Sequence, residues 1–152
     1  MNFSKMNFLH GCKNFILSLF QKTTIGVRIL VKKEDYILLV HHTYAPDWHC
    51  IGGGVDPHET PHQAACRELY EEGGIRPKGP LTLFGFYYNP YAGRHDYVAL
   101  YICEDFDQVP VSSPEIDEIK WFSLNNLPPD LSPATRRRVE EYFNSHSISD
   151  RW

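Results

Sequence analysis

Residues 53–75 read GGVDPHETPHQAACRELYEEGGI and predict a loop, a short helix and a second turn. Thr60 is a favourable N-cap, Pro61 suits the first helical position, and Gln63 completes a Thr-x-x-Gln capping box. The glycine pair at the end of the stretch is typical of a helix C-terminus. We therefore expect a helix over residues 61–73, held between two glycine-rich turns.

Three glutamates of this expected helix share one face. Glu71 and Glu72 follow Glu68 by three and four positions, so their side chains lie about 5–6 Å apart on neighbouring turns. A solvated acidic face would cost only a few tenths of a kcal/mol per pair, so it is one interpretation. If the face is partly enclosed, a divalent cation neutralises it, and carboxylate oxygens favour Mg²⁺ or Mn²⁺.

The frame around the glutamates resembles the signature of the Nudix hydrolases. That signature is Gly-x5-Glu-x7-Arg-Glu-aliphatic-x-Glu-Glu-x-Gly-aliphatic, and every specified position is matched between Gly53 and Ile75. A looser resemblance runs from residue 25 to about residue 143 and leaves out residues 1–22. Ile51 stands where family members commonly have a proline, which changes a backbone constraint and no ligand.

The resemblance implies an α/β fold, a Nudix-type α/β/α sandwich around a mixed β-sheet. The Nudix hydrolase domain would occupy residues 23–152, with an extra N-terminal amphipathic helical segment at residues 1–22. The implied reaction is Mg²⁺- or Mn²⁺-dependent hydrolysis of the pyrophosphate linkage in a nucleoside diphosphate joined to another moiety, with ADP-ribose or a nucleotide sugar favoured. Diadenosine polyphosphates and nucleoside triphosphates are alternatives, because Pro90 and Tyr91 fit the family markers of two substrate classes.

Roles carry over position by position from the resemblance. The implied metal ligands are one carbonyl oxygen and three carboxylates: Gly53, Glu68, Glu71 and Glu72. Glu59 and Arg67 would form an orienting ion pair, which as a plain surface pair would be worth only ~0–1 kcal/mol. Glu68 and Glu71 are also catalytic candidates within the helix. Glu115 and Glu118, on a later loop, are the other candidates for the general base.

Four residues outside the signature are candidate substrate contacts: Arg28, His42, Trp48 and Arg94. Trp48 offers a face for a base to stack on, and the other three offer polar contacts to phosphate or ribose. The plainer interpretation places the aromatic residue in the core and the others on solvated strand edges. The expected partner is a small-molecule nucleoside diphosphate derivative and no nucleic acid, because the chain lacks a basic stripe.

Two other functions compete with hydrolysis of a pyrophosphate. Residues 58–62 spell His-Glu-x-x-His, a zinc-protease motif that needs both histidines on one helical face. Pro61 inside that turn would break the helix, so we interpret the motif as coincidental. A non-catalytic Nudix-like nucleotide-binding module is the second alternative, but such a module would be expected to lose metal carboxylates, and this chain retains them all.

The flanking sequence predicts further strands and a final helix. β-rich runs occur at six places: residues 25–31, 36–42, 48–51, 81–89, 97–103 and 116–122. Ser132-Pro133 is expected to start a helix that ends near Phe143. Within it, Arg136-Arg137-Arg138 predicts a solvated basic face with Glu140 and Glu141 as partners. Strands and helices alternate irregularly, so we expect a mixed sheet with helices on both faces.

Composition fits one globular domain of 152 residues, with 42% hydrophobic and 22% charged residues. The four cysteines are far apart and suggest no disulfide framework, so we expect a cytoplasmic protein. Apolar residues in the first 22 positions recur every three or four residues beside lysines, which predicts an amphipathic helix. That helix would pack on its own domain or on a second subunit in a homodimer, or contact a membrane surface peripherally.

Overall fold

The computed structural model describes residues 23–91 and 94–152, with the side chains of Tyr91 and Arg94 left out. The predicted amphipathic segment at residues 1–22, with its suggested dimer and membrane contacts, lies outside the described residues. Eight strands and two helices make up the described elements: β1 Thr23–Lys33, β2 Tyr36–His42, β3 Trp48–His49, α2 Pro61–Gly73, β4 Ile75–Pro77, β5 Thr82–Tyr91, β6 Arg94–Cys103, β7 Phe106–Gln108, β8 Ile116–Ser123 and α3 Pro133–Phe143.

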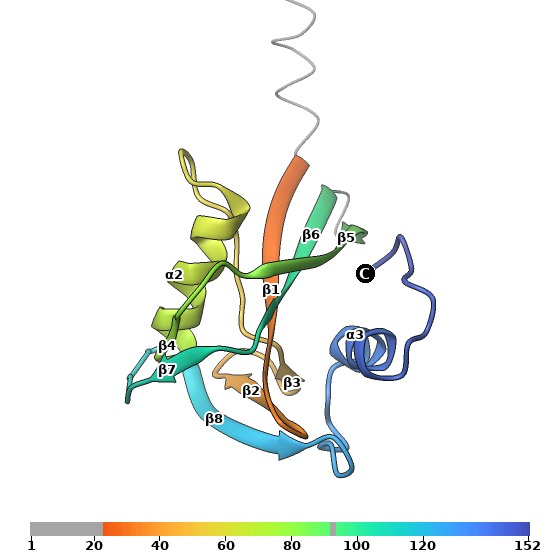
Figure 1. Cartoon of the computed structure of the whole chain (residues 1–152). Helices are drawn as coiled ribbons and strands as arrows, with labels where there is room; N and C mark the ends of the chain where they lie inside the picture. Colours follow the sequence, from red (N-terminus) through yellow and green to blue (C-terminus); the bar gives the residue numbers. More distant parts are fainter. Residues whose placement is uncertain (1–22, 92–93) are drawn as a thin grey trace, which may run out of the picture.

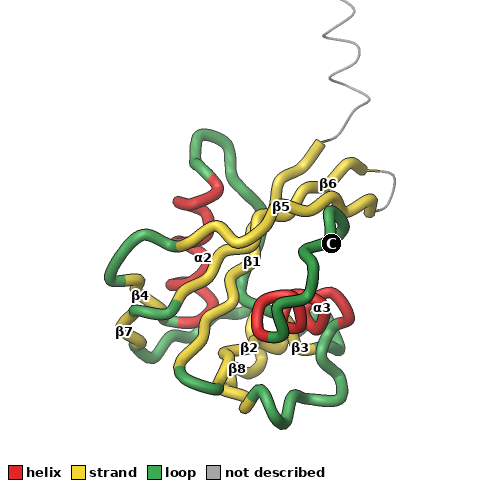
Figure 2. The backbone as a smooth tube through the Cα atoms, turned by 45° about the vertical axis from the view of Figure 1, so that its right-hand side comes forward, coloured by secondary structure: helices red, strands yellow, loops and turns green. Residues whose placement is uncertain are grey.

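The main sheet is mixed, as predicted. Its path runs β3-β2-β1-β6-β5, with β8 paired to β2. β1 pairs in parallel with β6 and antiparallel with β2. The two helices lie on opposite sides of this sheet (Figure 1), and the tube view shows the same three layers (Figure 2). The α/β/α arrangement inferred from the sequence is therefore confirmed.

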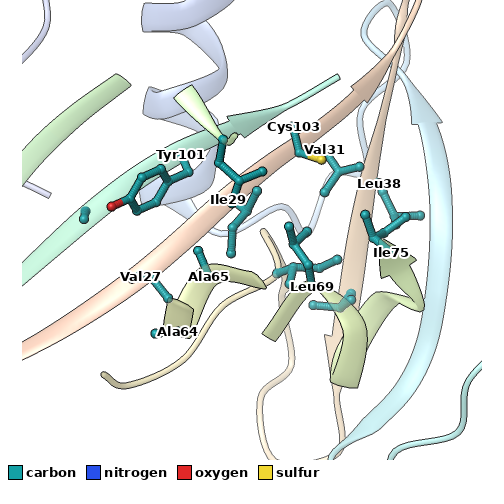
Figure 3. Packing of buried hydrophobic residues seen from close by; sticks show 14 residues of the cluster. Val27, Ile29, Val31, Leu38, Ala64, Ala65, Leu69, Ile75, Tyr101 and Cys103 are labelled. Atoms are coloured by element: carbon teal, nitrogen blue, oxygen red, sulfur yellow. The ribbon is translucent and has the colours of Figure 1, made fainter. Parts of the chain in front are cut away.

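Each face of the sheet packs against one helix, because successive strand residues point to opposite faces. Val27 and Ile29 of β1 contact the α2 side, where Ala65 and Leu69 complete the core cluster (Figure 3). Leu30, one position on from Ile29, belongs to the second cluster with Val139 of α3 and Tyr87 of β5. Burial on both faces fixes the position of β1. Backbone hydrogen bonds join β1 to residues 50–60, the segment that leads into α2 and is called the signature loop below.

Helix α2 begins and ends where the sequence predicts. The Thr60 hydroxyl accepts a hydrogen bond from the Gln63 amide at 3.2 Å, and the Gln63 side chain accepts from the Thr60 amide at 2.8 Å. Gly74 ends the helix in the left-handed region with φ 64°. A side chain there would overlap the carbonyl oxygen of Val109, so only glycine fits this close approach.

A small second sheet was not predicted from the sequence. β4 and β7 pair antiparallel over three residues each, and the Val109 amide donates to the Gly74 carbonyl at 2.9 Å beyond them. Gln108 also donates from its side chain to the carbonyl of Gly73 at 3.2 Å. This pairing fastens the end of α2 to the segment that leads into the loop of residues 111–115.

The basic run on α3 differs from its prediction. Arg138 has no exposed surface and pairs with Glu141, itself 7% exposed, at 2.7 Å. Arg137 is exposed, as expected for a solvated face. Arg138 is buried because the chain returns after α3 and covers it: the Arg151 carbonyl accepts from its guanidinium at 2.9 Å. Among the described helices, none is long and apolar enough to span a bilayer.

Candidate functional site

An open cavity of about 590 Å³ lies between helix α2 and the loop that precedes β8. It brings together three glutamates of the signature, called the box glutamates below (Glu68, Glu71 and Glu72), and Glu115, one of the two loop candidates for the general base. The residues that line it come from two segments: Arg67, Glu68, Tyr70, Glu71 and Glu72 from α2, and Val111, Ser112, Ser113, Pro114 and Glu115 from the loop. The acidic face is therefore partly enclosed, which is the condition under which a cation was expected.

Glu72 is the most firmly held of the three carboxylates. It is 5% exposed, and one oxygen lies 3.0 Å from Nε2 of His42 while the other accepts from the Gly52 amide at 3.0 Å. Gly52 belongs to the signature loop, and His42 ends β2. Burial with two polar partners gives the carboxylate one defined orientation.

His42 was predicted to contact substrate, but the structure places it behind a carboxylate. Its side chain is 3% exposed and packs edge-on against His49, with 5.7 Å between ring centroids. Because its Nε2 faces Glu72, His42 acts as a positioning residue in this geometry.

Glu68 lies against the signature loop at Gly53. A β-carbon built on Gly53 would overlap one Glu68 carboxylate oxygen, so the absent side chain makes room for that carboxylate. Burial raises the pKa of Glu68 and the negative charges of Glu72 and Glu71 add to the rise, while the hydrogen bond from Arg67 opposes it. This is a carboxylate whose charge is incompletely compensated by the protein, and a cation would compensate it.

Arg67 links the loop to the acidic face, and its predicted ion pair with Glu59 is present at 2.7 Å. The same guanidinium donates to the Gly54 carbonyl at 3.0 Å, to Glu68 at 2.7 Å and to Glu71 at 3.3 Å. Hydrogen bonds from Arg67 and from the Asp56 backbone lower the pKa of Glu59. Arg67 therefore joins the signature loop to α2 through backbone and side-chain contacts.

The donor set of this site suits a hard divalent cation. Carboxylate oxygens from Glu68, Glu71 and Glu72 reach one cavity, and hard oxygen ligands favour Mg²⁺ and Mn²⁺ over softer metals. Over residues 23–91 and 94–152, no group of three Asp, Glu, His or Cys side chains is already arranged so that it could hold a metal ion. Arg67 hydrogen-bonds two of the three box carboxylates, so a metal would have to share them with it. The carbonyl oxygen of Gly53, which was predicted as a fourth metal ligand, accepts a hydrogen bond from the Val27 amide of β1 at 2.9 Å.

The two loop candidates for the general base are placed differently. Glu115 lines the cavity opposite α2, and its carbonyl accepts from the Thr43 amide at 3.0 Å. Glu118 lies in β8 and pairs with His41 of β2. Val40, the residue before His41, packs on the α2 side of the sheet. Alternation along the strand therefore directs Glu118 to the other face of the sheet.

Of the remaining predicted substrate contacts, Trp48 and Arg28 do not line this cavity. Trp48 is 7% exposed and packs edge-on against Phe122 with 4.8 Å between ring centroids, so the structure gives it a core role. Arg28 donates to the carbonyls of Cys50 and Gly52 at 3.2 and 3.0 Å, which braces the signature loop. The side chain of Arg94 lies outside the described residues.

A second cavity, of about 360 Å³, lies beside the signature loop on the α3 face of the sheet. Asp96 lines it and accepts from the Thr24 hydroxyl at 2.8 Å and from the Asn89 amide at 3.2 Å. The sequence did not predict this cluster of polar residues, because Thr24, Asn89 and Asp96 come from three different strands and no sequence motif links them. Its lining is shared by three strands, the loop and the end of the chain: Thr24, Ile25, Gly26, Val27, Arg28, Gly53, Gly54, Asn89, Asp96, Val98 and Trp152.

The His-Glu-x-x-His sequence does not form a zinc site. His58 adopts a left-handed backbone conformation with φ 71°, outside the helix that begins at Pro61. His62 lies in the first turn, where its Nε2 accepts from the Leu81 amide at 3.3 Å. The two imidazoles therefore do not share a helical face, and the interpretation as coincidence is confirmed.

The family model of the NUDIX domain matches residues 22–143. The chain belongs to this family. A solved Nudix relative, the MutT NUDIX hydrolase from Burkholderia pseudomallei, superposes with a TM-score of 0.70 at 30% identity and covers 79% of this chain and 98% of that one. The fold and the signature helix are thus those of a Nudix domain.

Curated relatives of this Nudix chain have different substrates in their names. Rat diphosphoinositol polyphosphate phosphohydrolase 2 is 41% identical over 81 residues, which cover 52% of this chain and 44% of the relative. RNA pyrophosphohydrolase of Rhizobium meliloti is 32% identical over 121 residues, covering 66% of this chain and 72% of the relative. The chain spans about half the length of the diphosphoinositol relative.

Proposed function

We propose that this Nudix protein is a Mg²⁺- or Mn²⁺-dependent pyrophosphohydrolase of a small nucleoside diphosphate derivative, with ADP-ribose the first candidate substrate. The observation that carries the proposal is the buried, doubly hydrogen-bonded Glu72 beside Glu68 in an open acidic cavity. Names of the relatives support hydrolysis of phosphorus anhydrides. A binding module that had lost catalysis would not need a carboxylate pair held at this cost in desolvation.

A divalent cation held by Glu68, Glu71 and Glu72 would neutralise the diphosphate, polarise a phosphoryl oxygen and lower the pKa of water. The chain supplies the rest. His42 and the Gly52 amide hold Glu72 in one orientation before substrate arrives. Arg67 keeps α2 against the signature loop.

Glu115 is the proposed general base, because it faces the box glutamates across the cavity and Glu118 does not. A carboxylate there would take a proton from a water molecule that lies in the cavity between α2 and the loop. Glu68 is the alternative base, and the rise of its pKa by burial supports that role because it increases the proton affinity of the carboxylate.

The second cavity favours a nucleoside over a heavily phosphorylated ring. Its described lining contains Asp96 and a single cation, Arg28, whose guanidinium already serves two backbone carbonyls. Such a lining repels additional phosphates and suits the hydroxyl and amine donors of ribose and a base. ADP-ribose meets these demands better than a diphosphoinositol polyphosphate, the substrate class in the name of the rat relative.

A substrate screen with Mg²⁺ and with Mn²⁺ tests the proposal. ADP-ribose, UDP-glucose, diadenosine polyphosphates, nucleoside triphosphates and a diphosphoinositol polyphosphate are compared, and hydrolysis in ¹⁸O-labelled water identifies the attacked phosphorus. We expect ADP-ribose to have the highest kcat/KM and Glu72→Gln to lose at least about 100-fold in kcat. Glu140→Gln, on the outer helix α3, is the matched control and retains activity.

Each part of the proposal has its own contrary result. Wild-type turnover by Glu72→Gln, with an unchanged melting temperature, contradicts the metal site. Preference for the diphosphoinositol polyphosphate contradicts only the substrate. Equal losses from Glu115→Gln and Glu118→Gln contradict the assignment of the base.

A further inference from the structure

The end of the chain is built into the edge of the sheet. After α3, residues 144–152 return to β5, where the Tyr88 amide donates to the Asp150 carbonyl at 2.8 Å and the Trp152 amide donates to the Tyr88 carbonyl at 3.0 Å. These bonds, one on each side of Arg151, form a parallel bridge to the edge strand. Trp152 thereby reaches the wall of the second cavity beside Gly53 and Gly54.

A buried polar network on α3 holds this returning segment. One Glu141 oxygen accepts from Arg138 at 2.7 Å and from the Ser149 amide at 3.0 Å, and the other accepts from the Tyr87 hydroxyl at 3.0 Å. Arg138 also donates to the Arg151 carbonyl. The network thus connects α3 and β5 to two points within four residues of the end of the chain.

The indole of Trp152 is supported from behind. Its ring packs edge-on against Tyr87 with 5.5 Å between centroids, and the Arg138 guanidinium lies 5.3 Å from the ring centroid. The same guanidinium also lies over the ring of Tyr87, 4.1 Å from its centroid. Two supports and a backbone hydrogen bond restrict the indole, so ordering it on ligand binding costs little entropy.

We infer that Trp152 is a specificity-determining residue, an aromatic wall that stacks the planar base of the substrate, held in place by the buried Arg138–Glu141 pair. The inference rests on the proposed function for its substrate class. A base stacked on Trp152 would lie beside Asp96 and Asn89, which offer an acceptor and an amide to its polar edge or to the ribose. A sugar or inositol phosphate without a base gains nothing from this wall.

Variants of Trp152 separate stacking from packing. Trp152→Leu removes the aromatic face and retains the backbone bond to Tyr88, whereas Trp152→Phe retains a ring. We expect Trp152→Leu to raise KM for ADP-ribose about tenfold with kcat within twofold, and Trp152→Phe to recover most of the loss. Ile148→Ala, at a residue 51% exposed on the same segment and absent from the cavity lining, is the matched control and leaves KM unchanged.

A binding measurement makes the inference testable without turnover. AMP and ribose 5-phosphate are titrated into metal-free protein while tryptophan fluorescence is followed. AMP should quench the wild type and not Trp152→Leu, in which Trp48 and Trp121 remain, and ribose 5-phosphate should quench neither. Melting temperatures and amide exchange at Trp152 report whether each variant keeps the segment on β5.

Three outcomes overturn the inference: equal KM in wild type and Trp152→Leu, no quenching of wild type by AMP, or equal quenching by ribose 5-phosphate. If Trp152→Leu unfolds, Trp152→Phe and Trp152→Tyr decide, since both retain a ring and must keep a KM for ADP-ribose close to that of the wild type. Failure of every nucleoside diphosphate as a substrate defeats the proposed function instead, and the AMP titration still tests the stacking wall by itself.

Discussion

Replacing Gly53 by alanine should inactivate the enzyme while leaving the fold in place. The added methyl would overlap a Glu68 carboxylate oxygen and lie 2.7 Å from the carboxylate carbon. Carbon atoms normally approach to about 3.5–4.0 Å, so the carboxylate must move by about 1 Å. Displacements of this size in a reacting site cost roughly 100-fold in rate, or about 2.7 kcal/mol in the barrier.

The cost in stability is much smaller. Gly53 does not have a positive φ, so alanine fits its backbone. The Glu68 carboxylate is the end of a flexible side chain, and its pair with the partly exposed Arg67 is worth at most about 1 kcal/mol. Reduced freedom of the unfolded chain returns about 0.4–1 kcal/mol. The melting temperature should therefore change by no more than roughly 4 °C.

Gly79→Ala is the matched control, because a β-carbon there meets no atom within 4 Å and Gly79 lines neither of the two cavities described above. Metal-dependent kcat/KM for ADP-ribose and thermal melting are measured for both variants and the wild type. We expect kcat/KM to fall about 100-fold in Gly53→Ala and to stay within threefold in Gly79→Ala. Equal activity of the two alanine variants would refute the role given to the Glu68 carboxylate. A collapse in melting temperature of Gly53→Ala would instead show that the loop itself is disturbed.

Further predictions concern three side chains outside the signature. His42→Leu leaves a Glu72 oxygen buried without its partner and should weaken Mn²⁺ binding about 10- to 100-fold in calorimetry; unchanged affinity would contradict its positioning role. Arg138→Met strands Glu141 in the core and should lower the free energy of unfolding by about 3–5 kcal/mol in urea titrations, against about 0.5–1.5 kcal/mol for the exposed Arg137→Met, which loses one hydrogen bond to the Trp152 carbonyl. Burial, with help from Arg28 and His42, lowers the pKa of His49 to about 4 from its ordinary value of 6.5. Between these values the unfolded chain binds the extra proton, so stability should fall as pH drops from 6.5 to 4, and His49→Gln should flatten that slope.

The parts of the fold that the sequence predicts are those whose signals are local. The cap residues Thr60 and Gln63, the stop at Gly74 and the three glutamates all lie within fifteen residues, so helical spacing alone brings them together. The strand positions also follow from local β-rich runs. The three-residue strands β4 and β7 are too short for such a pattern, because each is defined only by its partner.

The sequence did not show contacts between residues that are distant along the chain. β2 is buried on both faces by the two helical layers, so alternation could not show that His42 faces inward toward Glu72, thirty positions away. The sequence also could not show that the ring of Trp48, predicted as a stacking surface, packs against Phe122 in the core. Arg138 looked like part of a solvated run because its cover, the segment that ends at Trp152, returns from the other end of α3.

The loop that bears Glu115 is anchored at both ends, and within it Ser113 accepts hydrogen bonds from the backbone amides of Glu115 and Ile116. Val109 is fastened to Gly74 at the close of α2, and Glu115 is fastened to Thr43 at the close of β2. Insertions or deletions among the five intervening residues would shift the carboxylate relative to the box without disturbing either anchor or any core contact. A change in loop length would therefore move Glu115, the proposed general base, while Glu68, Glu71 and Glu72 keep their positions on α2.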